Sequence, residues 1–414
     1  RFLAAIVLAI GVFFQTAESF KRIAQPVFML LLLAILMIVQ LIPLPYSLWS
    51  SLPDREVIVE TGELLGLSGI WRPLSFSPLK TANSLASLIV PLAALMLLAL
   101  FDDAGWSRVR KLVIIAGVAS AFLGMAQLLL SHASGLYFYE ITNMGSAVGL
   151  FANRNHNALL LNIALLFSVF EAWRTSFFRG AGLQLFSVAS QVVLLVAILV
   201  NGSRFGLVLL VFIAIVCASV VITSGRSKKH VSRNLAREKL VFGVSVAVAM
   251  GLLALFTFSA RIPAFSRFFA RSLDEELRAQ TLPYMLDLMW NHFPYGVGFG
   301  AFEQAYRVIE PVELLRPTYL NHAHNDWLQI VIEGGVVAVC LMGVALFLLA
   351  RRGFLLRRER RSGQVVLSEA WLGLLSISMI ALHSLVDYPL RVPSIMLVCT
   401  VCVGMLFCSI SSLQ

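Results

Sequence analysis

Long apolar runs alternate with short polar segments along the whole chain. Runs of about 17 to 25 apolar residues are long enough to cross a bilayer as α-helices, and the pattern predicts eleven such spans. Because the first run is short and the sequence begins at Arg1 rather than Met, we leave open a preceding helix or signal. We therefore expect an all-α, polytopic membrane protein of about 11–12 transmembrane helices. The predicted spans are approximately residues 2–17, 26–45, 80–101, 111–130, 155–172, 183–201, 205–223, 240–258, 327–350, 368–386 and 391–410.

Composition supports a membrane protein. The 414 residues are 59% hydrophobic and 13% charged, with a mean hydropathy of +0.86, which is too apolar for an ordinary soluble domain. The five cysteines all lie inside predicted spans, where a thiol packs as a small apolar side chain. Cys399 and Cys402 form a CxxC, but without further ligands packing is favoured over a redox or zinc role.

Basic residues predict the orientation in the membrane. Lys and Arg are densest in 226–239 and 351–361, and such loops face the cytoplasm. Counting spans outward places the basic stretches 19–22 and 106–111 on the same side. The net charge of +10 is therefore read as a topology signal and not as nucleic-acid binding.

Four polar clusters are expected on the opposite face, which in a bacterium is the periplasmic face of the inner membrane. We interpret them as one site, although polar residues also cap helix ends at lipid headgroups. The chain is divided into N-terminal transmembrane helices (1–258), a helical periplasmic segment (259–326) and C-terminal transmembrane helices (327–414). The clusters are FANRNHN (151–157), NGSR (201–204), the long segment 259–326 and HSLVDYPLR (383–391).

The outer segment contains a helix and a tight turn. Ser272 followed by Glu275 matches a capping box, so a helix is expected to start there, to be bent by Pro283 and to stop at Phe293-Pro294. YGVGFG (295–300) follows. No strand is predicted before this glycine pattern, so we favour a turn between helices over a dinucleotide-binding loop.

Arginines in this segment indicate an anionic ligand. It has six arginines and no lysine, and the planar guanidinium binds phosphate oxygens bidentately. Arg204 adds a charge between two close spans, where an ionisable group is a functional candidate. The alternative is that these side chains extend from helix ends to the headgroups.

Two histidines lie at the start of a predicted span, in NHAHNDWLQ. Asp326, Gln329 and Glu333 share one helix face, and this polar stripe is expected to face a cavity in the protein. A neutral histidine there, His322 or His324, could take a proton from a hydroxyl nucleophile. A helix cap is an alternative, and a zinc site lacks a clear third ligand.

Together these motifs resemble the O-antigen ligase and polymerase superfamily of bacterial inner-membrane glycan transferases, which have a GT-C-like helical fold. The resemblance covers about residues 140–400 in the family's order. The combination of PYGVGFGAF with a following HNDWLQ is more specific than either motif alone. The matching stretches are GLFANRNHNALL, NGSRFG, the Arg278 helix with HFPYGVGFGAF, NHAHNDWLQIVIEGG and HSLVDYPLRVPS.

The resemblance implies transfer of a glycan from a polyprenyl-diphosphate donor to an acceptor sugar hydroxyl, without metal or cofactor. By position, Arg204 and Arg278 would hold the diphosphate and His324 would activate the acceptor. Direct displacement assisted by this base would invert the anomeric centre. Further donor or acceptor contacts are expected from His156, His322, Asn325 and Asp326. The resemblance does not settle the role of Arg154, for which we expect a phosphate or sugar contact, with helix capping as the alternative.

The main alternatives concern the acceptor to which the glycan is transferred. A polymerase extends another lipid-linked glycan, a ligase transfers the glycan to lipid A core, and some relatives glycosylate proteins. The NRNH-type motif slightly favours a polymerase, and the short end after residue 410 disfavours the protein-modifying branch. A transporter is a more distant alternative, but no repeat relates the two halves. A serine hydrolase would use Ser203 with His324.

Overall fold

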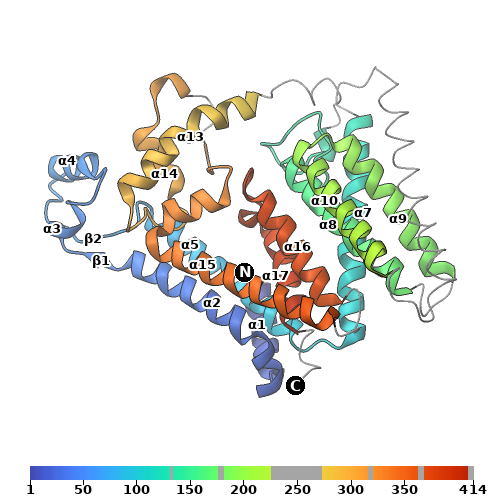
Figure 1. Ribbon diagram of the computed structural model, residues 1–414. Helices are drawn as coiled ribbons and strands as arrows, with labels where there is room; N and C mark the ends of the chain where they lie inside the picture. The colour runs from blue at the N-terminus through green and yellow to red at the C-terminus, as the bar shows by residue number, and fades with distance from the viewer. Residues whose placement is uncertain (131–133, 176–180, 225–272, 316–319, 362–367, 409–414) are drawn as a thin grey trace. The chain divides into compact units, whose positions relative to one another are not determined.

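The computed structural model describes residues 1–130, 134–175, 181–224, 273–315, 320–361 and 368–408. Nearly all of the secondary structure in these residues is helical (Figure 1). They form two packing units. Unit 1 contains residues 1–100, 273–355 and 384–414, and unit 2 contains residues 101–272 and 356–383.

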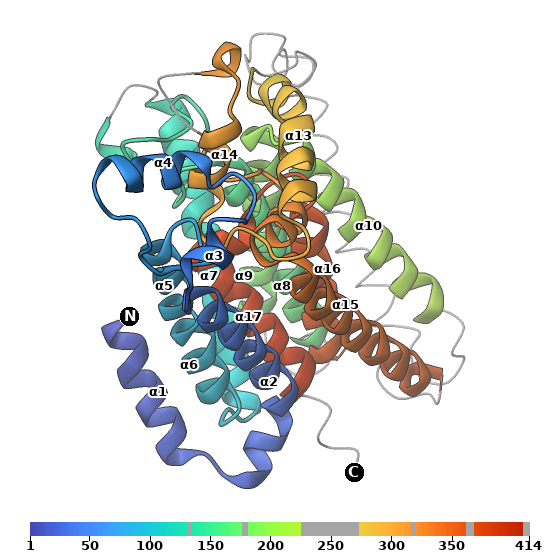
Figure 2. The same cartoon turned by 90° about the vertical axis from the view of Figure 1, so that its left-hand side faces the viewer.

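The apolar helices of unit 1 come from both ends of the chain. Helix α1 packs on α6, and α17 packs on α6 and α2, as Figure 2 shows for α1 beside α6. Leu36 and Met37 of α2 form a buried cluster with Phe299 and with Ala338 of α15. The helices are α1 (Phe2–Phe14), α2 (Ala17–Leu41), α5 (Pro78–Ser87), α6 (Ile89–Leu98), most of α15 (Asp326–Arg361) and α17 (Pro393–Cys408).

A second, smaller part of unit 1 consists of shorter and more polar elements. Its core is built by Met285, Leu288, Phe302 and Tyr306, which pack with Ile332 of α15. The two short strands pair antiparallel. The elements are β1 (Pro43–Leu44), α3 (Tyr46–Trp49), α4 (Glu56–Leu64), β2 (Arg72–Pro73), α13 (Leu273–His292), α14 (Phe302–Ile309), η2 (Val312–Leu314) and η3 (Pro389–Arg391).

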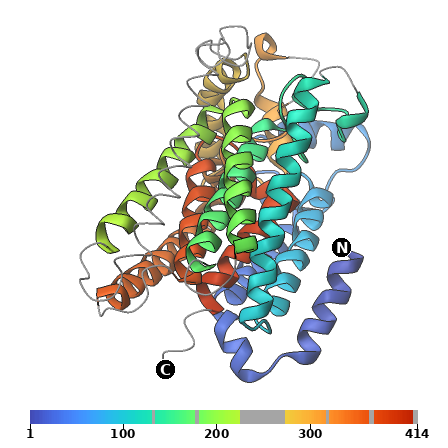
Figure 3. The same cartoon turned by 90° about the vertical axis from the view of Figure 1, so that its right-hand side faces the viewer.

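Unit 2 is a helix bundle in which α7, α8 and α9 pack on one another and α8 also contacts α10 and α16 (Figure 3). Small residues let the backbones approach: a Cβ at Gly117 of α7 would lie 2.3 Å from the Ala164 Cβ of α8. The elements are α7 (Asp103–Leu129), η1 (Ser134–Leu136), α8 (Arg154–Thr175), α9 (Ala181–Asn201), α10 (Arg204–Ser224) and α16 (Glu369–His383).

The predicted membrane architecture is confirmed. Among the described residues, five helices are long and apolar enough to cross a membrane, and five shorter apolar helices accompany them. The chain is a multi-pass membrane protein. The predicted span 240–258 and the basic cluster 226–239 lie outside the described residues, as do Ser272 and the outer arginines Arg261, Arg267, Arg271 and Arg316.

Some predicted boundaries differ from the structure. The stretch 19–22, expected between two spans, lies inside α2, because Thr16 and Ser19 form a capping box that starts this helix earlier. The basic stretch 106–111 lies within α7. Its Arg110 is buried and bonded to the carboxylates of Glu171 and Glu369, so this charge is neutralised inside unit 2.

Helix α15 is interrupted at Gly335, whose φ of 58° is outside the helical range. The interruption leaves carbonyl groups without their helical partners, and in a membrane such groups need other donors. Val297 N and Gly298 N donate to the carbonyls of Ile332 and Glu333 at 2.9 and 3.0 Å. The Gln40 side chain also donates to the Glu333 carbonyl, at 2.8 Å.

The glycines of the YGVGFG segment make this close contact possible. Gly296, Gly298 and Gly300 all have positive φ, and a Cβ at Gly296 would lie 2.6 Å from the Glu333 carbonyl oxygen. The segment is therefore a tight turn that packs on the break in α15. The predicted turn is confirmed, and the element before it in the described chain is helix α13 rather than a strand.

Candidate active site

His324 lies two residues before α15 and is paired with a carboxylate. Its Nδ1 is 3.2 Å from Asp387 Oδ1, and the backbone N–H of Tyr388 donates to the same oxygen at 3.0 Å. The His324 side chain is 22% exposed, whereas that of Asp387 is fully buried. The φ of His324 is 49°, a strained value for a residue other than glycine, and such strain is concentrated at functional sites.

Arg278 of α13 contacts the same carboxylate. Its Nη2 is 3.9 Å from Asp387 Oδ2, and its Nη1 donates to the Val386 carbonyl at 3.1 Å. Its Nε is buried and has no hydrogen-bond partner among the described residues. Asp387 therefore links the predicted base to one of the predicted phosphate-binding arginines.

Asp326, the first residue of α15, holds the segment 384–391 against the helix. Its backbone N–H donates to the Ser384 carbonyl at 2.9 Å. Its Oδ2 accepts from the Ser384 hydroxyl at 3.1 Å and from the Leu390 N–H at 3.0 Å. These bonds fix the segment that carries Asp387 to the start of α15, next to the loop that carries His324.

Glu333 completes the polar stripe and pairs with Arg391. Arg391 Nη1 is 2.9 Å from Glu333 Oε2, and its Nε is 3.5 Å from Asp326 Oδ1. Two carboxylates thus flank one guanidinium, and such pairing offsets part of the cost of burying the charges. The stripe is buried, and it faces the segment 384–391.

Gln329 connects this ion pair to His322. Its Oε1 accepts from the Ala323 N–H at 3.0 Å. Its Nε2 lies 2.9 Å from Glu333 Oε1 and 3.3 Å from His322 Nδ1. The ring of Tyr388 contacts both histidines, with its centroid 4.4 Å from that of His322 and 4.8 Å from that of His324.

Asn325 has a local structural role. Its Oδ1 accepts from the Leu328 N–H at 3.0 Å, which satisfies one of the donors left open at the start of a helix. The side chain therefore caps α15 and fixes the loop that carries His324.

The remaining predicted residues lie in unit 2, at the starts of two helices. Arg154 begins α8 and Arg204 begins α10. The Asn201 side chain donates to the Arg154 carbonyl at 3.1 Å, so the FANRNHN and NGSR clusters meet. His156 is buried beside Phe151, with ring centroids 6.4 Å apart. The meeting of these two clusters with the His324 region stays a prediction.

Ser203 lies at the start of α10 and caps this helix. Its hydroxyl donates to Asn155 Oδ1 at 2.9 Å and accepts from the Gly206 N–H at 3.2 Å. This is the hydrogen bonding of a helix N-cap, and it supports a structural role for the serine.

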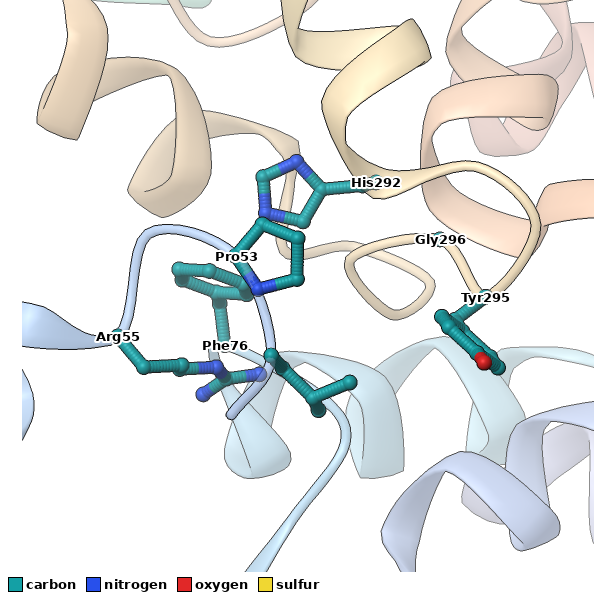
Figure 4. Close-up of a pocket in the computed structure, with 7 residues that line it drawn as sticks. Pro53, Arg55, Phe76, His292, Tyr295 and Gly296 are labelled. Carbon is teal, nitrogen blue, oxygen red and sulfur yellow. The ribbon is translucent and has the colours of Figure 1, made fainter. Parts of the chain in front are cut away.

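A small pocket lies elsewhere in unit 1, at the end of α13 (Figure 4). Arg55 stacks on Phe76 with its guanidinium carbon 3.9 Å from the ring centroid. Burial and the charge of Arg72 lower the pKa of Arg55 to about 10. His292 Nε2 is 3.5 Å from Asp54 Oδ2, and burial lowers the pKa of His292 despite this carboxylate.

Possible metal ligands are scattered over the described residues. This part of the chain contains no group of three or more His, Cys, Asp or Glu side chains arranged to hold a metal ion. Metal independence stays a prediction, because it concerns the reaction and not the arrangement of side chains alone.

Part of the chain matches a known protein family. A family model described as O-antigen ligase matches residues 189–343. The match covers less than half of the chain and shows that this part is similar to that family. The predicted resemblance to the O-antigen ligase and polymerase superfamily is thereby confirmed, whereas no curated protein matches the chain.

The matched region includes Arg204, Arg278 and His324 but ends before Asp387. The carboxylate partner of His324 therefore lies outside the matched region. Sequence reasoning identified the cluster 383–391 but not the separate roles of Asp387, Tyr388 and Arg391. The feature of the sequence that could have indicated these roles is the group of polar residues in DYPLR (387–391), which directly follows an apolar span.

Proposed function

We propose that this protein transfers a glycan from a polyprenyl-diphosphate donor to an acceptor hydroxyl at the outer face of the bacterial inner membrane. The observation that carries the proposal is the pairing of His324 with the buried Asp387, within a chain whose residues 189–343 match an O-antigen ligase family model. A carboxylate bonded to one imidazole nitrogen orients the ring and stabilises its protonated form.

In the proposed reaction His324 accepts the proton of the acceptor hydroxyl. The acceptor oxygen forms a bond to the anomeric carbon while the bond from that carbon to the phosphate oxygen breaks. The electron pair stays on the departing diphosphate. Displacement from the opposite side inverts the anomeric centre.

Arginines are proposed to neutralise the diphosphate. Arg278 lies beside Asp387 and has five N–H donors, so its contacts with Asp387 and Val386 leave capacity for phosphate oxygens. Arg204 stands at the start of α10, and we propose a second phosphate contact there. Fixed guanidinium groups stabilise developing negative charge as a metal ion does in other enzymes.

The acceptor class is the finer part of the proposal. The NRNH-type motif favours a polymerase, which would lengthen a lipid-linked glycan. A ligase would instead produce a glycan attached to lipid A core. Product analysis in reconstituted membranes that contain both acceptors separates the two.

The test compares wild-type protein with His324→Ala in reconstituted membranes supplied with a lipid-linked glycan and with EDTA present. General-base catalysis contributes about 10²- to 10⁴-fold, so the variant is expected to lose transfer by that factor. Ser203→Ala is the matched control and should keep most activity, since Ser203 caps a helix. Near-normal transfer by a folded His324→Ala protein would contradict the assignment of His324 as the base. Separately, loss of wild-type transfer when EDTA is added would contradict metal independence.

A further inference from the structure

The two histidines of the NHAHND motif have different hydrogen-bond partners at Nδ1. A neutral imidazole carries its proton on one nitrogen and a lone pair on the other. The partner of Nδ1 therefore decides what Nε2 can do.

At His324 the partner is an acceptor. Asp387 Oδ1, 3.2 Å from Nδ1, belongs to a carboxylate, which accepts hydrogen bonds when ionised. Nδ1 therefore carries the proton, and Nε2 carries the lone pair. This is the tautomer that can take a proton from a hydroxyl through Nε2.

At His322 the partner is a donor. The Gln329 amide is oriented by the Ala323 N–H, which donates to Oε1 at 3.0 Å. The amide nitrogen therefore faces Glu333 Oε1 at 2.9 Å and His322 Nδ1 at 3.3 Å. Because this nitrogen only donates, His322 Nδ1 accepts, and its proton lies on Nε2.

We infer that His322 and His324 are held in opposite tautomers, so that His324 acts as the base while His322 donates its Nε2–H to an oxygen of the substrate diphosphate. The diphosphate oxygen gains negative charge as the bond to the anomeric carbon breaks, and a donor placed there stabilises it. No proton leaves His322 in this step. The inference rests on the proposed function for the identity of the anion.

The tautomers are measured directly by magic-angle-spinning NMR of the full chain with isotope-labelled histidine, reconstituted in lipid above pH 7. The two ring nitrogens have distinct shifts in each tautomer. The signal lost in His322→Gln should be that of an Nε2-protonated ring, and the signal lost in His324→Gln that of an Nδ1-protonated ring. Equal or exchanged tautomers would overturn the inference, whatever the transfer activity.

A second experiment compares the rate of glycan transfer by His322→Gln with that by His322→Asn. The glutamine amide nitrogen reaches the position of Nε2, whereas that of asparagine corresponds to Nδ1. A hydrogen bond to a charged group corresponds to about a 10- to 150-fold effect, so His322→Asn should weaken transfer by this factor and His322→Gln by less.

The pH dependence of the transfer rate distinguishes a hydrogen-bond donor role of His322 from a role as a second base. The acidic limb of the pH–rate profile should persist in both His322 variants, because His324 is still present as the base. Loss of that limb in His322→Gln would overturn the donor role. If wild-type protein transfers no glycan while the tautomers are as expected, the proposed function fails and the tautomer assignment stands.

Discussion

Replacing Asp387 by asparagine tests how the buried carboxylate supports His324. The substitution keeps the shape of the side chain and removes its charge. Asp387 Oδ1 accepts from both His324 and the Tyr388 N–H, whereas Oδ2 faces Arg278 at 3.9 Å. The amide oxygen is therefore expected at the Oδ1 position, since the reverse orientation would place N–H groups against the Tyr388 N–H.

The expected loss of transfer rate depends on which interactions this orientation of the introduced amide would preserve. The His324 tautomer is kept, and the lost interactions are those of the carboxylate charge with the imidazolium formed during transfer and with Arg278. Hydrogen bonds to charged groups contribute about 1.5–3 kcal/mol, which corresponds to about a 10- to 150-fold lower rate. Asp387→Leu removes the acceptor altogether and should approach the loss of about 10²- to 10⁴-fold expected without a base.

The assay is the transfer rate against pH for wild-type, Asp387→Asn and Asp387→Leu proteins at matched levels in membranes. The acidic limb for Asp387→Asn should move to lower pH, because the imidazolium has lost its counter-charge. Wild-type rates for both variants, or an unmoved acidic limb, would refute the role of Asp387.

Three further predictions concern other parts of the chain. Arg204→Lys and Arg278→Lys should both lower donor binding, since lysine keeps the charge but loses the bidentate fork; donor affinity at wild-type level would support simple headgroup anchoring instead. Gly335→Ala should lower the thermal unfolding temperature, because its Cβ would lie 2.0 Å from the Pro294 carbonyl oxygen, whereas the control Gly343→Ala places its Cβ in open space; equal unfolding temperatures for the two variants would contradict a tight contact at the break. The pKa of His292 is lowered in the fold, so its contribution to stability is complete above the unfolded pKa of about 6.5 and is lost as the pH falls through the folded pKa. The free energy of unfolding of His292→Gln should therefore depend less on pH in this acidic range. A pH dependence equal to that of the wild-type protein would exclude His292 as its cause.

The membrane helices and the α13 helix were predictable because their signals are local. An apolar run near 20 residues predicts a span without reference to the rest of the chain. The stripe of Asp326, Gln329 and Glu333 follows from helical periodicity alone. Its partner Arg391 does not, because their pairing depends on the fold of the chain between them.

Features that depend on distant segments were missed. Asp387 is 63 residues from His324, and Gln40 is 293 residues from the Glu333 carbonyl that it satisfies. The elements in residues 43–77 also escaped prediction, since their strands have only two residues each and carry no periodic pattern. The break at Gly335 lies within an apolar run, where a glycine pair is a weak signal.

That break has a mechanical consequence. Membrane helices respond to a thicker or thinner bilayer by tilting, and an uninterrupted α15 would pass such a tilt directly to the loop that carries His324. Here the residues before Gly335 are held by the YGVGFG turn and Gln40, and Val336, directly after the break, donates its N–H to the Pro294 carbonyl at 2.9 Å. We therefore expect a change of tilt in lipid to bend the apolar length of α15 beyond Val336, because both sides of the break are fixed to one turn, and this would make the geometry of the histidine loop independent of bilayer thickness.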